Sequence, residues 1–185
     1  LRWAQANGFQ WCNLTITVSA ASSGSVALLE WLAQENKCGF NAYTCATAAR
    51  GGHLELLCWL RANGCPWDAS TSASAAEYGH LAVLQWSHAN GCPLDEETFY
   101  NAARGGHVEV LKWLRARHCA WSSETVFSAI LYGHLEAVQW LRANGCPWDA
   151  SVCLAAEEAD KGAAGDRRIM SEWVHANGCP CRHNG

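Results

Sequence analysis

The sequence predicts an all-α protein, a solenoid of stacked helix-turn-helix repeats. The prediction depends on three residue patterns that share one spacing of 27 residues. Patterns of different residue types seldom share a period by chance, and a fixed period of about 20–50 residues is typical of repeat proteins. The three patterns are Gly52-His53, Gly79-His80, Gly106-His107 and Gly133-His134; Trp59, Trp86, Trp113 and Trp140; and Cys38, Cys65, Cys92, Cys119 and Cys146.

We expect a single repeat array over residues 1–185. Residues 1–8 are interpreted as the end of a preceding repeat and residues 179–185 as a tail, and the missing initial Met indicates a fragment of a longer protein. Trp140 and Trp173 are 33 residues apart instead of 27, so we expect an insertion within residues 157–168, either a loop or an extended first helix. The expected repeats are 9–36, 37–63, 64–90, 91–117, 118–144 and 145–178.

Each repeat is expected to begin with a short first helix. A residue that caps helix N-termini well stands at one position of the repeat, and in four of these repeats a threonine follows three residues later. Small residues then let two helices approach closely, and the glycine of the Gly-His pair ends the helix. The expected caps are Asn41, Asp68, Asp95, Ser122 and Asp149, and the small residues include Ala48, Ala75, Ala102, Ala129 and Ala156.

A longer second helix is expected after each Gly-His pair. Val108, Leu111 and Leu114 are three residues apart, as on one face of a helix. Asn-Gly pairs end most of these helices, because both residues accept the left-handed backbone of a helix C-terminus, and a proline then prevents continuation. These pairs are Asn63-Gly64, Asn90-Gly91, Asn144-Gly145 and Asn177-Gly178. Such a unit cannot bury its apolar face alone, so the repeats must stack.

Residues 102–114, AARGGHVEVLKWL, resemble the second half of the ankyrin repeat, A-A-x-x-G-H-L-E-V-V-K-L-L-L-x-x-G-A. Residues 48–54 and 75–81 resemble it in the same way, and the resemblance runs from about residue 13 to 178. The ankyrin period is about 33 residues, and the residues missing here fall where that family has its β-hairpin fingers. The T-P-L-H stretch is also absent. We therefore expect an ankyrin-like α-solenoid with short or missing fingers.

The resemblance implies a non-catalytic scaffold for protein–protein interaction. Partners of ankyrin repeats usually contact the inner, first helix and the turns, and the two positions before Gly-His commonly contribute. In this chain these positions differ between repeats, whereas the surrounding frame is constant. The implied partner-binding surface consists of Tyr43, Arg50, Glu77, Tyr78, Glu97, Arg104, Glu124, Leu131 and Tyr132.

The charge balance argues against several classes of partner. The chain has 13 Lys and Arg against 17 Asp and Glu, and its formal net charge is −4. Nucleic-acid-binding proteins normally have a basic surplus, and membrane-surface anchors are polybasic. No apolar stretch approaches the roughly 18 residues of a membrane span. We expect a monomer that binds a protein or peptide, with no nucleic acid or membrane partner.

The repeated histidines and tryptophans are predicted to be structural. Four histidines at one repeat position fit a hydrogen bond that stabilises each turn better than a metal or catalytic site. The tryptophans of the second helices are expected to pack as a ladder between repeats. For the tryptophans after the Cys-Pro turns, packing and partner binding both remain open; these are Trp11, Trp67, Trp121 and Trp148.

The repeated cysteines are predicted to be buried thiols without disulfide bonds. Equivalent positions of stacked helices lie about 8–10 Å apart, whereas a disulfide needs Cα atoms within about 7 Å. Free thiols and the absence of a secretory segment indicate an intracellular location, cytoplasmic or nuclear. The tail Cys179-Pro180-Cys181-Arg182-His183 has two interpretations, a zinc site or a frayed terminus in which Cys179 continues the ladder.

No catalytic residue, cofactor site or metal site is predicted. Ser, His and Asp occupy repeated structural positions, and the Gly-Gly pairs lack the lysine of a phosphate-binding loop. Two alternatives to the stand-alone scaffold remain. The chain is a substrate-recognition or targeting segment of a larger multidomain protein, or it is a zinc- or redox-responsive cysteine array.

Overall fold

The computed structural model describes residues 14–36, 38–161 and 166–178. These residues form twelve helices and no strand, which confirms the all-α repeat fold and the absence of β-hairpin fingers in the described part of the chain. The helices are α2 (Leu14–Ser22), α3 (Val26–Asn36), α4 (Ala42–Arg50), α5 (Leu54–Ala62), α6 (Ala69–Glu77), α7 (Leu81–Ala89), α8 (Glu96–Arg104), α9 (Val108–Arg115), α10 (Ser123–Leu131), α11 (Leu135–Ala143), α12 (Ser151–Lys161) and α13 (Asp166–Ala176).

The chain divides into two compact units, which are described separately. Unit 1 consists of the described residues of Leu1–Ala75 and Ala82–Pro93, so it holds α2 to α5 and most of α6 and α7. Unit 2 consists of the described residues of Ala76–Leu81 and Leu94–Gly185. The end of α6 and the Gly-His turn after it therefore belong to unit 2, together with α8 to α13.

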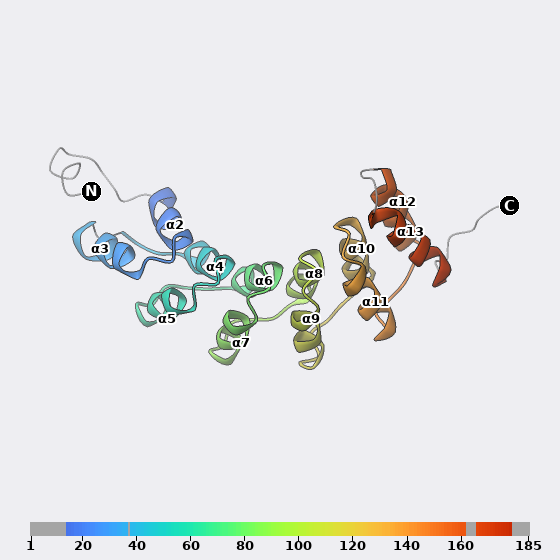
Figure 1. Cartoon of the computed structure of the whole chain (residues 1–185). Coiled ribbons are helices and arrows are strands. Elements are labelled where there is room, and N and C mark those ends of the chain that lie inside the picture. The colour runs from blue at the N-terminus through green and yellow to red at the C-terminus, as the bar shows by residue number, and fades with distance from the viewer. Residues whose placement is uncertain (1–13, 37, 162–165, 179–185) are drawn as a thin grey trace. The chain divides into compact units, whose positions relative to one another are not determined.

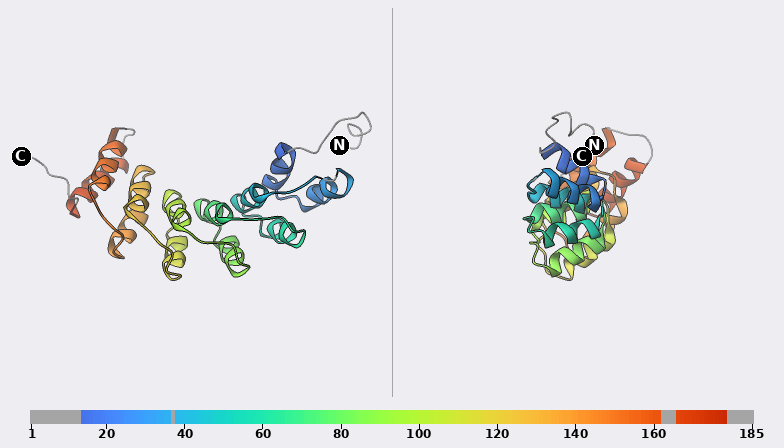
Figure 2. Two further views of the ribbon diagram at one scale, coloured as in Figure 1. Left: turned by 180° about the vertical axis from the view of Figure 1, so that it is seen from behind. Right: turned by 90° about the vertical axis from the view of Figure 1, so that its left-hand side faces the viewer.

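Within each unit the helices form pairs that stack on one another (Figure 1). In unit 2 the first helices α8, α10 and α12 form a row, and α9 packs on α11 in a second row. The paired arrangement of α8 with α9 and of α10 with α11 is visible from both sides of the molecule (Figure 2). In unit 1, α2 packs on α4, and α3 packs on α5.

The insertion in the last repeat lengthens both of its helices. Helices α12 and α13 have 11 residues each, whereas α10 and α11 have nine. Residues 162–165 lie outside the described part, so the structure supports the extended first helix as one component of the insertion.

Threonine and the capping residue hold the start of the first helix together. The Asp95 Oδ1 accepts from the Thr98 N–H at 2.9 Å, and the Asp95 N–H donates to the Thr98 Oγ1 at 3.4 Å. Asn41 and Thr44 form the same reciprocal pair. Two donors that the helix itself leaves unpaired are thus satisfied locally. At Asp68 and Asp149 the carboxylate instead accepts from the N–H two residues ahead.

The small residues of the first helices are buried, as expected. Ala102 and Ala103 in α8 and Ala129 in α10 are fully buried, and so is the apolar face of α9 at Leu111 and Leu114. Small side chains such as Ala102 and Ala129 let neighbouring first helices approach closely, while larger first-helix residues such as Phe99 and Ile130 are fully buried as well.

Three histidines of the Gly-His turns, His53, His107 and His134, bind a main-chain carbonyl of the preceding repeat. In unit 2 the Nε2 atom of His107 lies 3.0 Å from the Glu77 carbonyl oxygen, and that of His134 lies 2.8 Å from the Arg104 carbonyl oxygen. In unit 1 the His53 Nε2 lies 3.1 Å from the Ser22 carbonyl oxygen. A carbonyl only accepts, so Nε2 is the protonated nitrogen. The structure thus supplies the acceptor of the structural hydrogen bond that the sequence predicted, a main-chain carbonyl of the preceding repeat.

The position of the His134 ring explains why the Gly-His turn of the preceding repeat has a glycine, Gly106. Gly106 has a left-handed backbone with φ 72°, and a Cβ on it would lie 2.4 Å from the His134 Nδ1. A side chain at this position is therefore excluded by the histidine of the next repeat as well as by the backbone conformation.

The asparagine at the end of the second helix forms a side-chain hydrogen bond and does not take the left-handed backbone expected from the sequence. Only the glycine of each Asn-Gly pair is left-handed, as at Gly145 with φ 79°. The asparagine side chain donates to the carbonyl four residues earlier, as from Asn144 Nδ2 to the Trp140 oxygen at 2.8 Å. Residues 117–118 lack the pair: there His118 takes the left-handed backbone with φ 56°, and Arg117 Nη1 donates to the Trp113 oxygen at 3.3 Å.

The repeated cysteines are buried free thiols, as predicted. Four of them donate the S–H to the carbonyl of the capping residue 24 positions earlier. The distances are 3.3 Å from Cys65 to Asn41, 3.3 Å from Cys92 to Asp68, 3.1 Å from Cys119 to Asp95 and 3.3 Å from Cys146 to Ser122. A small residue with a weak donor is therefore needed once per repeat.

We predict that replacing His118 by Gly raises the free energy of unfolding. A left-handed residue with a Cβ destabilises the folded state by about 1–2 kcal/mol, and glycine removes this strain. Glycine also has a larger conformational entropy in the unfolded state, which opposes the gain, so the net increase in the free energy of unfolding should be about 0.5–1 kcal/mol. Urea unfolding of unit 2 measures it. Gly145→Ala should lower the stability by a similar amount, since a Cβ there meets no atom within 4 Å and only the backbone is strained.

Gly39→Ala is the matched control for this prediction. Its Cβ would also meet open space, and Gly39 is not among the left-handed residues. If Gly39→Ala were as destabilising as Gly145→Ala, the backbone explanation would be wrong.

We also predict that His134 makes the fold less stable in mild acid. Burial lowers the pKa of His134 from its ordinary value of 6.5, and the bond to the Arg104 carbonyl only partly opposes this. The unfolded chain therefore binds the proton more readily, so this contribution to stability is complete above about pH 6.5 and declines below it. Between pH 7.5 and pH 5.5, the free energy of unfolding in urea should fall less for His134→Gln than for the wild type. If the free energy of unfolding fell equally in both proteins, His134 would not be the residue responsible for the loss of stability in acid.

Candidate functional site

The predicted site residues lie at the two ends of the first helices. In unit 1, Tyr43 lies in the first turn of α4, and Arg50 is the last residue of that helix. In unit 2 the remaining residues divide in the same way. Glu97 and Glu124 lie in the first turns of α8 and α10; Glu77, Arg104 and Leu131 end α6, α8 and α10; Tyr78 and Tyr132 follow directly after α6 and α10.

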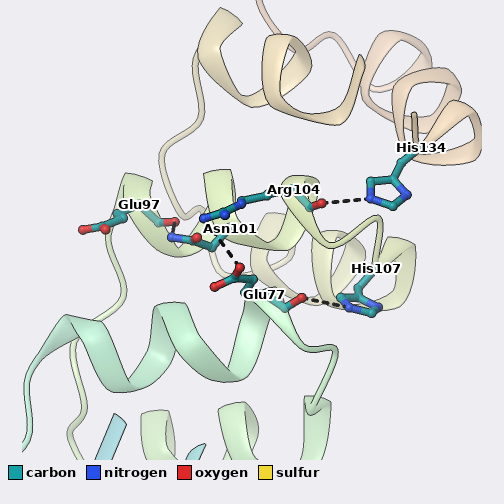
Figure 3. A network of polar contacts seen from close by, with 6 residues as sticks. All are labelled: Glu77, Glu97, Asn101, Arg104, His107 and His134. Carbon is teal, nitrogen blue, oxygen red and sulfur yellow. Dashed lines mark hydrogen bonds and ion pairs between the residues drawn. The ribbon is translucent and has the colours of Figure 1, made fainter. Parts of the chain in front are cut away.

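The structure brings three of these residues together, and we name them the Arg104 cluster: Glu77, Arg104 and Tyr132. The Arg104 Nη1 lies 3.5 Å from the Glu77 Oε1, as Figure 3 shows. The Arg104 guanidinium carbon lies 5.0 Å from the centre of the Tyr132 ring, a cation–π distance. The cluster therefore joins the C-terminal ends of the first helices of three successive repeats.

The Arg104 cluster is ordered by its contacts and still open to solvent. The side chains of Arg104 and Glu77 are 39% and 27% exposed, and Tyr132 is 44% exposed. The Glu77 carboxylate raises the pKa of Arg104, with a smaller contribution from Tyr132, so the guanidinium stays charged. An exposed ion pair contributes only about 0–1 kcal/mol to stability, so the cluster is free to serve a purpose other than folding.

The backbone beneath the cluster is fixed by the histidines. His107 binds the carbonyl of Glu77, and His134 binds the carbonyl of Arg104 (Figure 3). Both bonds use the main chain of the residue whose side chain belongs to the cluster. Because a carbonyl is the same in every residue, the side chain at this position can change from repeat to repeat without loss of the bond.

A polar stripe on α8 leads from the cluster toward the start of the helix. Glu97, Asn101 and Arg104 are four and three residues apart and so lie on one face of α8. The Asn101 side chain donates to the Glu97 carbonyl at 2.9 Å and is itself buried (Figure 3). Asn101 was not among the residues predicted from the sequence. The repeat period carries a signal for it, because the equivalent positions in three other repeats hold the polar residues Thr47, Ser74 and Ser128, whereas the last repeat has Ala155.

Two further tyrosines of the predicted site are exposed, one in each unit. Tyr78 is 40% exposed in unit 2, and Tyr43 is 57% exposed in unit 1. Leu131, by contrast, is half-buried. Two other large apolar side chains in the described part of unit 2 are exposed and were not predicted, Leu154 on α12 and Ile169 on α13.

The tryptophans of the Cys-Pro turns are packing residues. In unit 2 the Trp121 ring lies edge-on to Phe99 at 5.2 Å and to Trp140 at 6.1 Å between centroids. The Arg115 guanidinium carbon lies 4.2 Å from the centre of the same ring. In unit 1 the Arg61 guanidinium lies over the Trp67 ring, and a second tryptophan ring lies edge-on to it. In unit 2 the Arg142 guanidinium and another tryptophan ring contact Trp148 in the same way. These half-buried rings are held on more than one side, so the packing interpretation holds for them; Trp11 lies outside the described residues.

An open hollow lies beside the Gly-His turns of unit 2. Its volume is about 300 Å³, and its lining includes Gly79, Gly106, His107 and the carboxylate residues Glu109 and Glu136. The hollow could not be predicted from the sequence, because the residues that line it come from three repeats.

The described residues contain no group of three or more His, Cys, Asp or Glu side chains placed to bind a metal ion. The Cys-x-Cys-x-His tail that was considered for zinc lies outside the described residues. In the same part of the chain, each helix is too short or too polar to cross a membrane.

Comparison with known proteins agrees with this architecture. Residues 73–115 match the family model of ankyrin repeats in many copies. The fold is similar to the crystal structure of the human ASB11 ankyrin repeat domain, with a TM-score of 0.61 and 18% identity over 85% of this chain and 82% of that one. The sequence matches none of the curated proteins with which it was compared.

A second similar structure is a chain in the complex of the predatory endopeptidase Bd0816 from Bdellovibrio bacteriovorus with the immunity protein Bd3460. Its TM-score is 0.57 and its identity 17%, over 84% of this chain and 96% of that chain. The paired helices and the Gly-His turns, together with these similarities, show an ankyrin-repeat fold, and residues 73–115 carry the sequence match to that family.

Proposed function

We propose that this chain is a non-catalytic scaffold that binds a protein or peptide partner through the first-helix and turn face of unit 2. The Arg104 cluster is the observation that carries the proposal. It presents a charged and an aromatic side chain to solvent on backbone that is already fixed. Ankyrin repeats are generally protein-interaction modules, which supports the same function.

The residue types of the surface favour a protein partner. Tyrosine and arginine are enriched among the residues that contribute most to protein–protein affinity. The Arg104 guanidinium lies over the Tyr132 ring, and this contact reduces the side-chain entropy that is lost when a partner covers the two residues. Tyr78, next to Glu77 in the chain, adds a second exposed aromatic ring.

The charges of the surface argue against a nucleic acid. The Arg104 guanidinium already faces the Glu77 carboxylate. Glu97 and Glu124, on the first turns of α8 and α10, are both exposed and acidic. Since a nucleic acid is bound mainly through its phosphates, these carboxylates would repel it.

The proposal includes the absence of catalysis and an intracellular location. In the described residues, His107, His134 and Cys119 bind main-chain carbonyls of the preceding repeat, which supports a structural role for these three residues. Free buried thiols at Cys65, Cys92, Cys119 and Cys146 support a reducing compartment.

We predict that a variant with Tyr78→Ala, Arg104→Ala and Tyr132→Ala loses its partner. Affinity capture from a host lysate with wild-type and variant baits, read by mass spectrometry, should identify proteins retained by the wild type alone. Purified candidates are then tested for direct binding. Hot-spot residues contribute about 2 kcal/mol or more each, so the affinity should fall by at least about 100-fold.

A control variant of the second helices separates this surface from others. Lys112 and Gln139 hold equivalent positions in α9 and α11 and are exposed, as is Glu136. The variant Lys112→Ala, Glu136→Ala and Gln139→Ala should keep the partner. A partner lost from this control and kept by the first variant would move the site to the second helices and the adjacent hollow.

We predict that Arg104→Ala alone separates binding from stability. Because the ion pair with Glu77 is partly exposed, the free energy of unfolding should change by less than about 1 kcal/mol. The affinity for the partner should fall by at least about tenfold, since the guanidinium orients Tyr132 as well as offering donors. Urea unfolding and calorimetric titration measure the two quantities. A large loss of stability with unchanged affinity would assign Arg104 to the fold.

A further inference from the structure

In unit 1 a second cysteine, Cys45, lies beside one of the repeated cysteines, Cys65. Cys45 lies in α4, and Cys65 lies in the turn after α5. Their Sγ atoms are 3.3 Å apart, and the two residues are 0% and 2% exposed. Both are free thiols.

The contact between two thiols is not a constant feature of the repeats, because the position of Cys45 varies between them. In the following repeat of unit 1 the position of Cys45 is held by Ser72, whose Oγ lies 3.2 Å from the Cys92 Sγ. In unit 2 the same position holds Phe99 and Val126. The sequence places cysteines at both positions once more, Cys153 and Cys179, of which Cys179 lies outside the described residues.

The surroundings make the two thiols chemically different. The Cys45 S–H donates to the Cys65 sulfur, and this hydrogen bond lowers the pKa of Cys65. The Arg61 guanidinium acts in the same direction, whereas burial opposes it. The same hydrogen bond, together with burial, raises the pKa of Cys45. Cys65 is therefore the thiol that more readily becomes a thiolate, and Cys45 keeps its proton.

We propose that Cys45 and Cys65 form a thiol-oxidation site, at which a peroxide converts the two adjacent sulfurs into a disulfide bond. In the first step the Cys65 thiolate attacks one peroxide oxygen. A sulfur–oxygen bond forms, the oxygen–oxygen bond breaks, and hydroxide leaves. The hydroxide takes up the proton that the Cys65 thiol released, which gives the first water molecule.

In the second step the Cys45 sulfur attacks the sulfur of the Cys65 sulfenic acid. The sulfur–sulfur bond forms, the sulfur–oxygen bond breaks, and the hydroxyl group leaves with the Cys45 proton as the second water molecule. Two thiols are oxidised by two electrons, and one peroxide is reduced to two water molecules. A thiol reductant reverses the bond.

The geometry permits this bond with a small movement. A disulfide has its sulfurs about 2.05 Å apart, so the two atoms must approach by roughly 1.3 Å. Cys65 lies between the exposed residues Gly64 and Pro66, so a local opening of this turn brings the peroxide to a sulfur that is otherwise buried. The bond would tie α4 to the turn between α5 and α6.

Peptide mapping of the oxidised chain tests the proposal. The folded chain is treated with hydrogen peroxide, remaining thiols are blocked with N-ethylmaleimide, and the digest is analysed by mass spectrometry. We expect a linked peptide that joins Cys45 to Cys65, lighter than the two thiol peptides by two hydrogen atoms and removed by dithiothreitol. The same treatment in urea gives the reference in which native geometry is absent.

Two variants, each taken from the neighbouring repeat, make the test specific. Cys45→Ser copies the natural serine at Ser72 and should lose the link, with Cys65 stopping at a sulfenic or higher acid. Ser72→Cys copies the natural cysteine at Cys45 and should gain a second link, to Cys92. The gain keeps the proposal testable even if Cys45→Ser lowers the stability of the fold.

Cys58 provides the control for simple proximity in sequence. It is nearer to Cys65 along the chain than Cys45 is, and it is more exposed. The proposal is overturned if folded and urea-treated chains give the same ratio of Cys45–Cys65 to Cys58–Cys65 links. It is also overturned if folded wild type accumulates oxygen on Cys65 without forming the link.

Discussion

The hydrogen bond from the turn histidine to the preceding repeat is the contact on which each unit depends. His107 and His134 bind the carbonyl groups of Glu77 and Arg104 in unit 2, and His53 binds that of Ser22 in unit 1. The bond fixes one repeat against the next at the end of the first helix. It also requires a glycine beneath the ring, because a Cβ at Gly106 would collide with His134.

The choice of acceptor explains how a rigid frame can carry a variable surface. A main-chain carbonyl places no demand on its own side chain, so Glu77 and Arg104 differ while their histidine bonds are the same. Pairing of Arg104 with Glu77 and Tyr132 then orders the exposed groups without burying them. The surface therefore presents side chains whose identity is not needed for folding, which is the property of a recognition site.

The cysteines follow the same division between a constant and a variable position. The constant thiol donates to the carbonyl of a capping residue, as from Cys119 to Asp95, and this is a structural role. The position facing it holds cysteine, serine, phenylalanine or valine in the described repeats. Where it is Cys45, the contact brings two thiol sulfurs together, whereas Ser72 at the equivalent position forms a hydrogen bond to Cys92.

The sequence by itself determined the features that involve residues close together in the chain. Helix pairs, capping boxes such as Asp95 with Thr98, left-handed glycines and buried small residues all follow from a period of 27 residues and from bonds that span four residues or fewer. Only the tertiary structure decided the histidine acceptors, the Arg104 cluster and the Cys45–Cys65 contact. Their partners are 20 or more residues apart, so they depend on how neighbouring helices are placed, which local backbone preferences do not determine.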